Sequence, residues 1–430
     1  MATALANDTR ATLGPHAQQC QNRSLALDRF LNPLAKGRAR QAALQEIVAK
    51  PSMTFKRDAW LRVLLTDLRF RSDELLLAQL QSRLLLNLSS GLLENAGLCL
   101  DRLSGIPFVP GSAVKACARR MAVQRLAKTE TAEAKSGLLF RIALIFGWNE
   151  RDWRDEPSCD LALACNHLWP AARTIAQQRL ASHLGASWAQ LPRFAGSVSF
   201  LPAYPIRFNA RNLPQAEPAE GHDLVLEVLS DLHPRYRRGE LGAPLDMEEP
   251  AVTVFPAVAP GHVFVFAARP THRCMPELLD TARHWLKLGL EMFGLGARTA
   301  AGYGWFKDVS DVLRPHLDRM AADLRRARIE EERQRRAVVA AEVRRRIEEQ
   351  SRQSVPRHDH FRQQYLAMGD EPFAAVAKKF ETLSDDERLG FVQALKERRE
   401  TAKRWAKKKP EMFEPWRNYA QSLRPPIQLP

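Results

Sequence analysis

The stretch from Gly294 to Gly304 constrains the fold more than any other part of this chain. It reads Gly-Leu-Gly-Ala-Arg-Thr-Ala-Ala-Gly-Tyr-Gly, with four glycines in eleven residues. Residues 276–293 before it carry apolar side chains at helical spacing, and residues 303–309 after it have the composition of a strand. Because glycine tolerates positive φ and lets another backbone come close, the sequence predicts a helix, a tight glycine loop and a strand in that order.

This order differs from that of a nucleotide phosphate loop. Phosphate-cradling loops follow a strand and open a helix, so that the helix N-terminus faces the anion. Here the loop leaves a helix C-terminus, where the dipole repels anions. An anion site would therefore need backbone N–H groups from the glycine turns together with Arg298. A tight turn packed against its own sheet is the alternative.

The charge of the chain favours an anionic partner. The 430 residues include 64 Lys and Arg against 49 Asp and Glu, a formal net charge of +15. Residues 311–430 hold 27 of the cations and 20 of the acids, so the excess is spread over the chain. A spread of this kind suits a broad nucleic-acid footprint better than a detachable basic arm. A basic protein without such a partner is the alternative.

Cysteine spacing and hydropathy indicate the cellular compartment in which the protein is expected. Residues 1–20 lack the apolar core of a signal peptide, and no run reaches the roughly 18 apolar residues of a membrane span. The six cysteines include no Cys-x-x-Cys pair, so we expect reduced thiols in a cytoplasmic protein without a membrane partner. The group Cys159, Cys165, His167 and His183 matches no standard zinc spacing. We expect no metal and no cofactor.

A second motif opens a helix. Prolines at 107 and 110 hold the chain extended, and Ser112 is a candidate N-cap for a helix over 112–128. Lys115 would then lie in the first turn, with Arg119 one turn later and Arg120 alongside. Like charges at this spacing cost a few tenths of a kcal/mol, which a phosphate could offset. A capped surface helix with solvated cations is the alternative.

The expected elements follow a β-α-β-β-α-β order. The strands are expected at 83–88, 196–201, 262–267 and 303–309, and the helices at 112–128 and 277–293. Residues 252–255 and 262–267 are expected to form a hairpin. Residues 1–82 form an N-terminal helical segment with helices at 25–50 and 57–82, and residues 148–193 form a largely helical insertion. The predicted fold is α+β, with a ferredoxin-like domain over 83–310.

The C-terminal part is predicted to be all helical. Residues 311–353 are rich in Arg and Glu and form one long charged helix, with a thin apolar stripe. Residues 354–430 form a small basic bundle. Its expected core is Phe361, Tyr365, Phe373, Val376, Phe380, Phe391, Leu395, Trp405, Phe413, Trp416 and Tyr419. The cations between Lys403 and Lys409 are either an RNA contact or a solvated face.

Two motifs together resemble the RAMP superfamily of CRISPR proteins. They are the loop Gly-x-Gly-x-Arg-Thr-x-x-Gly-Tyr-Gly at 294–304 and Pro-Gly-Ser-x-x-Lys at 110–115. The resemblance covers about residues 83–309 and is greatest to the family of the sixth Cmr subunit. The middle departs from that pattern, because Pro202 stands where aspartate usually precedes Ala-Tyr-Pro, and Arg235 replaces a histidine.

The resemblance implies a function. The chain would be a non-catalytic, guide-RNA-binding structural subunit of a type III-B CRISPR antiviral effector, capping the backbone filament near the guide 3′ end. Its partners would be the CRISPR guide RNA, other RAMP subunits of the Cmr complex and, indirectly, the target RNA. The residues expected to contact RNA are Ser112, Lys115, Arg119, Arg120, Gly294, Gly296, Arg298, Thr299, Gly302 and Gly304.

Three alternatives remain open. A metal-independent endoribonuclease of the same superfamily would process CRISPR repeats, but none of the histidines has a recognised catalytic partner in the sequence. A generic RNA-recognition module would use the aromatics of 302–306, although these follow the second helix, not the third strand. A protein-only scaffold would act through the C-terminal helices.

Overall fold

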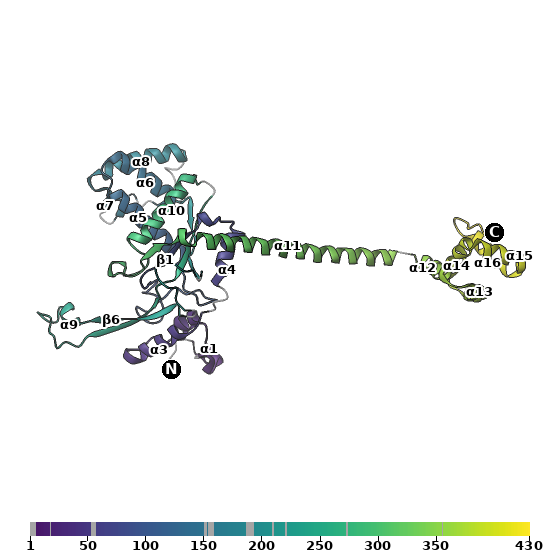
Figure 1. Cartoon of the computed structure of the whole chain (residues 1–430), viewed down its shortest axis with the longest axis horizontal. Helices are drawn as coiled ribbons and strands as arrows, with labels where there is room; N and C mark the ends of the chain where they lie inside the picture. Colours follow the sequence, from purple (N-terminus) through teal and green to yellow (C-terminus); the bar gives the residue numbers. More distant parts are fainter. Residues whose placement is uncertain are drawn as a thin grey trace. The chain divides into compact units, whose positions relative to one another are not determined.

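The computed structural model describes residues 6–17, 19–52, 57–149, 153, 159–185, 193–208, 210–219, 222–271, 274–354 and 356–430. The chain divides into two compact units, Met1–Arg326 and Ala327–Pro430. The first mixes helices with small antiparallel sheets, and the second is helical among its described residues. Figure 1 traces both units along the sequence.

A four-stranded antiparallel sheet organises the first unit. Its strands are β1 (Leu76–Leu80), β5 (Tyr204–Ile206), β8 (Val263–Phe266) and β10 (Phe306–Asp308). They are ordered β10-β1-β8-β5, so the first strand along the chain lies between the last two. In the register, Ala78 faces Asp308 on one side and Phe264 on the other.

Two helices, α5 (Gly111–Ala127) and α10 (Pro276–Met292), cover one face of this sheet. The buried side chains of this face come from alternate strand positions, as the period of 2 requires. Phe306 packs edge-to-face on Phe264 and Phe266, with ring centroids 5.8 and 5.5 Å away. The aromatics after the glycine loop therefore include a core residue.

The opposite face is covered as well. Leu77, Val263 and Val265 pack there with Leu64 of the helical segment α4 (Arg57–Arg62) and η4 (Val63–Asp67), and with Leu313 of α11 (Ser310–Ser354). All five side chains are at most 1% exposed. An RNA-recognition module stacks bases on an open sheet face. With both faces covered, this sheet offers no such platform, and that alternative is wrong.

The position of the first strand corrects two predictions. Residues 76–80 were expected in a helix, and the strand was expected at 83–88. In the structure only Leu84 makes an isolated bridge there, to Val258. The strand is buried on both faces, so its sequence Leu-Leu-Ala-Gln-Leu lacks the polar alternation that distinguishes a strand from a helix.

A further correction concerns the predicted hairpin. Strand β7 (Ala251–Val258) pairs with β6 (Leu224–Asp231) over eight residues, not with β8. The short helix α9 (Pro234–Arg237) lies in the connection between the two strands, and Figure 1 shows it beyond the end of β6. A turn does follow β7, with Gly261 at φ +89°, but it leads β8 onto β1 and β5. Local turn chemistry does not decide which neighbour a strand pairs with.

Around the sheet lie short strand pairs and helices. The strand expected at 196–201 is β4 (Val198–Phe200), which pairs with β9 (Ala268–Pro270). The insertion contains β2 (Gly147–Asn149), α7 (Asp160–Cys165), α8 (Trp169–Leu184) and β3 (Arg193–Ala195), and follows α6 (Ala132–Phe146). The N-terminal elements are α1 (Asn7–Leu13), η1 (Gly14–Ala17), α2 (Arg23–Leu25), η2 (Ala26–Phe30), α3 (Gly37–Ala49) and η5 (Ser72–Glu74).

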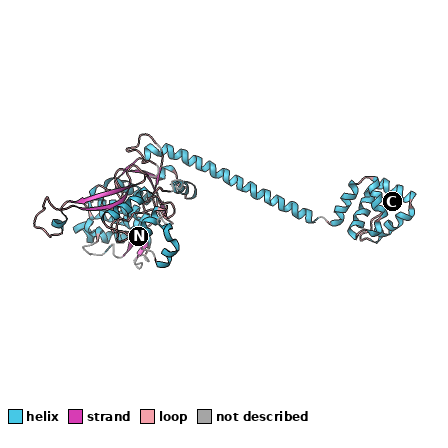
Figure 2. Ribbon diagram, turned by 90° about the horizontal axis from the view of Figure 1, so that it is seen from below, coloured by secondary structure: helices cyan, strands magenta, loops and turns pink. Residues whose placement is uncertain are grey.

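A helical C-terminal region was predicted from the sequence and is confirmed among the described residues. After α11, the bundle contains α12 (Arg357–Ala367), α13 (Asp370–Lys378), η10 (Phe380–Thr382), α14 (Asp385–Glu397), α15 (Arg399–Lys408) and α16 (Pro410–Ser422) (Figure 2). Every expected core residue belongs to its hydrophobic cluster. The aromatic residues therefore specify this core.

Candidate nucleic-acid interface

The glycine loop, residues 294–304, follows α10 and has an unusual backbone. All four of its glycines have positive φ, and Arg298 lies in the left-handed region at φ +55°. A non-glycine residue in that region is uncommon and is held there by its surroundings. The short turn η9 (Thr299–Ala301) forms the middle of the loop.

The base of the loop is seated on the segment after β1. The N–H of Ala297 donates to the Leu85 carbonyl at 2.8 Å, and the N–H of Gly304 donates to the Arg83 carbonyl at 2.9 Å. Leu295 donates to the Gly304 carbonyl across the loop at 2.8 Å. Gly294, Leu295 and Gly304 are buried. This half of the loop is therefore part of the packed structure, as the tight-turn alternative requires.

Two glycines serve different needs. At Gly296, φ is +98° and an added Cβ would overlap the Leu85 carbonyl, so the close approach of the two backbones requires glycine. At Gly302, φ is +91° but an added Cβ would meet nothing within 4 Å. There only the backbone conformation requires glycine, and the space beside it is open to a ligand.

The exposed half of the loop is its tip. Arg298, Ala300, Ala301 and Gly302 are exposed, and Thr299 is half-buried. The indole N–H of Trp305 donates to the Thr299 carbonyl at 3.3 Å and holds the turn in this conformation. The loop thus presents Arg298 and Thr299 on a rigid bend.

Helix α5 meets this tip through Arg120. Its guanidinium donates to the Thr299 hydroxyl at 3.3 Å and lies 4.7 Å from the centre of the Phe293 ring. The Arg298 guanidinium lies 5.6 Å from the centre of the Phe255 ring. Within the described residues, no ion pair is seen for either arginine. A guanidinium has five N–H donors, so most of them stay available for an anion.

The neighbouring cation of α5, Arg119, has a different partner. Arg119 forms a bidentate ion pair with Asp160 of α7, and Lys115 is half-buried. The structure therefore pairs Arg119 with α7 and brings Arg120 to the loop. These two side chains differ by about 100° around the helix, because an α-helix has 3.6 residues per turn.

The helix start corrects another prediction. Pro110, not Ser112, is the N-cap, and Ser112 makes no capping hydrogen bond. The Pro110 carbonyl already accepts from Ala113 and Val114, so the helix begins at Gly111. Gly111 lies close to the Phe200 carbonyl, where a Cβ would not fit. Ser112 is exposed in the first turn, and Lys115 falls in the second turn.

The backbone donors of the glycine turns are already in use. Gly302 donates to the Thr299 carbonyl at 3.0 Å, and Gly304 donates to the Arg83 carbonyl. These two amides therefore do not supply the anion contacts expected of them from the sequence. The groups at the tip that could still contact an anion are therefore side-chain groups: the guanidiniums of Arg120 and Arg298 and the hydroxyl of Thr299.

Three neighbours of the loop were not predicted as site residues. They lie near the Tyr303 side chain and are Phe255 of β7, Glu227 of β6 and Arg83. Arg83 pairs with Glu227 at 2.5 Å. Burial, together with Glu227, raises the pKa of the Tyr303 phenol. No sequence spacing links these positions, because the β6–β7 pairing that joins them was itself not predicted.

Two thiols of the first unit have raised pKa values. Burial raises the pKa of Cys117, beneath the loop, to about 12, with Arg120 opposing the rise. Burial likewise raises the pKa of Cys165 to about 11.

Among the residues that the structure describes, no three His, Cys, Asp or Glu side chains gather closely enough to hold a metal ion. Within the same residues, no helix combines the length and the apolar character needed to span a membrane.

Several solved structures are similar to this chain. One is a chain of the type III-B Cmr-beta bound to cognate target RNA, with 16% identity, 70% of this chain and 86% of that chain covered, and a TM-score of 0.36. Cmr6 from Pyrococcus furiosus has 19% identity over 54% of this chain and 97% of that chain, with a TM-score of 0.28. A chain of a type IV-B CRISPR complex has 15% identity over 55% and 88%, with a TM-score of 0.29. No family model and no curated protein matches the sequence.

Proposed function

We propose that this chain is a guide-RNA-binding structural subunit of a type III-B CRISPR effector complex, equivalent to its sixth Cmr subunit. In that role it caps the backbone filament near the 3′ end of the guide and docks on neighbouring RAMP subunits. The observation that carries the proposal is the meeting of Arg120 with Thr299 at the tip of the glycine loop, beside Arg298. Arg298 and Thr299 belong to the loop motif by which the sequence resembles the RAMP superfamily, and Arg120 lies in the helix that the Pro-Gly-Ser-x-x-Lys motif opens.

The fold supports this proposal through its strand order. The elements β1, α5, β5, β8, α10 and β10 follow one another as β-α-β-β-α-β, and the sheet order places the fourth strand beside the first and the third beside the second. We infer a ferredoxin-like unit from this order. It starts at β1, within the segment that the sequence assigned to N-terminal helices.

The physical basis is the grip on a phosphodiester. Arg120 contacts the tip of the loop and Arg298 belongs to it, and neither has a carboxylate partner among the described residues. A charge-assisted hydrogen bond to phosphate is about twice as strong as a neutral one. Phosphate contacts of this kind hold a strand in register and are indifferent to its sequence. A guide RNA, whose sequence varies, needs such a contact.

We further propose that the chain does not cleave RNA. An acid–base ribonuclease needs a group that exchanges protons near neutral pH. The groups beside the loop with shifted pKa values, Cys117 and Tyr303, both shift upward, away from neutrality. The repeat-processing endoribonuclease remains the competing function, and it makes the opposite prediction.

One experiment separates the two. The purified full chain is incubated with labelled single-stranded and repeat-containing RNA at low salt without added metal, and both retention and product length are measured. The proposal predicts retained, intact RNA. Specific cuts that disappear when one histidine is replaced would establish the endoribonuclease instead, and no retention at all would contradict both functions.

A further inference from the structure

A second cationic site lies at the other end of the α5–α10 helix pair. A cavity of about 600 Å³ opens between α5, α6 and α10. Three cations line it: Arg125 in the last turn of α5, Lys128 at its C-cap and Arg141 in the middle of α6. His284 of α10 adds a ring nitrogen, and the side of Trp285 forms an apolar wall. We refer to this cavity as the α5–α6–α10 groove.

The cations of the groove are not explained by neighbouring acids. In the described part of the chain, no ion pair is seen for Arg125, Lys128 or Arg141. Positions three and four residues from Arg141 are glycine, leucine or isoleucine, so no helical partner stands beside it. Glu133 of the same helix pairs with Arg179 instead. The groove therefore brings three cations to one cavity.

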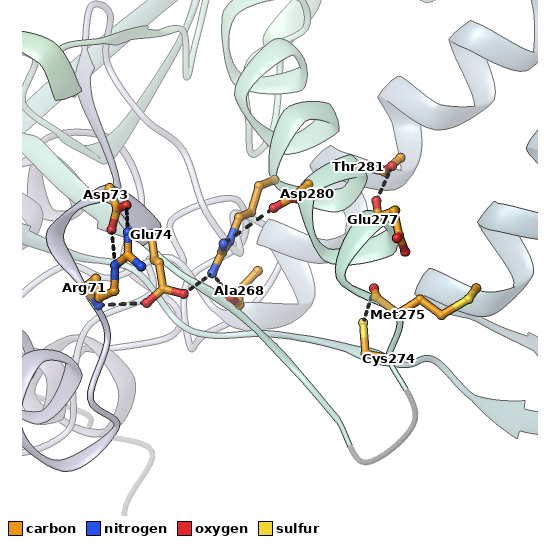
Figure 3. A network of polar contacts seen from close by, with 10 residues as sticks. Arg71, Asp73, Glu74, Ala268, Cys274, Met275, Glu277, Asp280 and Thr281 are labelled. Atoms are coloured by element: carbon orange, nitrogen blue, oxygen red, sulfur yellow. Dashed lines mark hydrogen bonds and ion pairs between the residues drawn. The ribbon is translucent and has the colours of Figure 1, made fainter.

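The one carboxylate lining the groove, Asp280, lies beside a second set of charges. Figure 3 shows it next to a polar network that joins α10 to η5. Arg283 lies 3.9 Å from Asp280, 3.6 Å from Glu74 and 3.3 Å from the Ala268 carbonyl. Asp280 is thus shared with Arg283, and the groove keeps an excess of positive charge.

The helix dipole accounts for only part of this arrangement. Cations near a helix C-terminus are favoured, which explains Arg125 and Lys128 on α5. It does not explain Arg141, which lies in the interior of α6 and faces the same cavity. A ligand with more than one negative charge would satisfy all three.

The groove and the glycine loop lie along the same helix pair. Cys117 of α5 contacts Gly294 at one end, with its sulfur 3.8 Å from the glycine carbonyl, whereas Arg125 shares the groove with Thr281 and His284. Helices α5 and α10 therefore run antiparallel. From Arg120 to Lys128 the rise along α5 is about 12 Å, and the two side chains point within about 80° of each other.

We propose that the α5–α6–α10 groove is a second phosphate-binding site, which takes the backbone of a single-stranded RNA whose other contact is the glycine loop. The inference rests on the proposed RNA-binding function. The two sites together give the strand a path along α5. The cations of the groove contact phosphates, and such contacts are independent of base sequence.

The test compares four forms of the full chain. The groove variant is Arg125→Gln, Lys128→Gln and Arg141→Gln, and the loop variant is Arg120→Gln and Arg298→Gln. A matched control, Arg325→Gln, Arg333→Gln and Arg336→Gln, removes the same charge from exposed positions of α11. Kd for a labelled single-stranded RNA is measured by fluorescence anisotropy over a range of salt, and circular dichroism verifies the fold.

The groove variant is expected to raise Kd at least tenfold and to reduce the salt slope by about 2, since each single-strand phosphate contact contributes about 0.7. The control should stay within about twofold of wild type, because dispersed charge acts only at long range. Lys128→Gln alone should show about a third of the slope change, which keeps the test available if the triple variant misfolds.

The outcomes separate the two claims. If the groove variant matches the control while the loop variant loses binding, the groove proposal is overturned and the proposed function stands. If the groove variant loses binding while the loop variant does not, the groove is supported and the glycine loop is not the RNA contact. Wild-type protein that binds no RNA overturns both.

Discussion

At the scale of single residues, the candidate interface depends on how arginines are partnered. Arg119 and Arg120 are adjacent in sequence, yet one is tied to Asp160 and the other reaches the Thr299 hydroxyl. Arg23 shows the opposite extreme, because it is fully buried and bonded to Asp223, with Nη1 2.7 Å from the nearer carboxylate oxygen. The partner thus decides whether an arginine holds the fold together or faces a ligand.

Replacing the tip arginines should weaken RNA binding without unfolding the chain. Arg120→Gln and Arg298→Gln would each remove one of the proposed phosphate contacts, so we expect about 1 kcal/mol of lost binding per substitution and a salt slope smaller by about 0.7 each. Isothermal titration at several salt concentrations measures both quantities. Arg119→Gln is the control and should leave the slope unchanged; an equal loss there would show that α5 binds through its other side.

Breaking the buried Arg23–Asp223 pair should destabilise the first unit. Arg23 also donates to the Gly105 carbonyl at 2.6 Å. It therefore joins the N-terminal segment to Gly105 and, through Asp223, to the start of β6. Arg23→Met removes the guanidinium that pairs with the buried Asp223 carboxylate, and we expect a loss of about 3–5 kcal/mol in the free energy of unfolding. Urea denaturation measures it. The double variant Arg23→Met, Asp223→Asn should recover part of the loss, and an unchanged stability in the single variant would contradict the account.

At the scale of elements, the glycine loop and its flanking helix could be predicted from sequence because their signals are local. Helical periodicity ends where the glycines begin, and each glycine meets a need of the backbone. Strand β1 could not be predicted in the same way, since Leu77 and Leu80 are buried on opposite faces and the run lacks polar alternation. The β6–β7 pairing depends on tertiary contacts that no local turn encodes. The residues that depended on it, Phe255 and Glu227, were missed for that reason.

An ion pair joins the two elements that flank the glycine loop, α10 and β10, and should make the stability depend on pH. Lys287 of α10 lies 2.5 Å from Asp308 of β10. Burial tends to raise the pKa of Asp308, but hydrogen bonds from Lys287 and Ser310 outweigh it and lower the pKa. The hydrogen bond to Asp308 in turn raises the pKa of Lys287.

Asp308→Asn should therefore cost about 1–2 kcal/mol in the free energy of unfolding at neutral pH, allowing for the half-exposed lysine. The contribution of Asp308 is complete above its unfolded pKa of about 3.9 and is lost as the pH falls through the lower folded value. The lysine contribution is complete below about pH 10.4 and is lost as the pH rises further. Denaturation of both proteins across this range measures the difference, and a penalty that persists at acid pH would contradict the ion-pair explanation.

At the scale of the whole molecule, the two units have separate hydrophobic cores. The core of the second contains only side chains from residues after 360, and Phe391 lies at its centre with Phe373 4.9 Å and Trp416 5.4 Å away between ring centroids. Composition predicted this unit well, because its aromatic residues are spaced for short helices. Both units carry excess positive charge, as the sequence alone shows.

Phe391→Ala should destabilise the second unit alone. Removing a fully buried ring leaves a cavity and costs about 3–5 kcal/mol. In calorimetry we expect one transition to move to lower temperature while the transition of the first unit, and RNA binding by the glycine loop, stay as in wild type. A common shift of the whole unfolding profile would show that the two units unfold as one.

The central claim is that RNA lies against the tip of the glycine loop where Arg120 meets Thr299. Photo-crosslinking of full-length protein to single-stranded RNA carrying 4-thiouridine, followed by peptide mapping, tests it most directly. The account predicts crosslinks in the peptides that carry residues 294–305 and the part of α5 around Arg120, and their loss in the Arg120→Gln, Arg298→Gln variant. Crosslinks confined to α11–α16, with none on the loop, would contradict it.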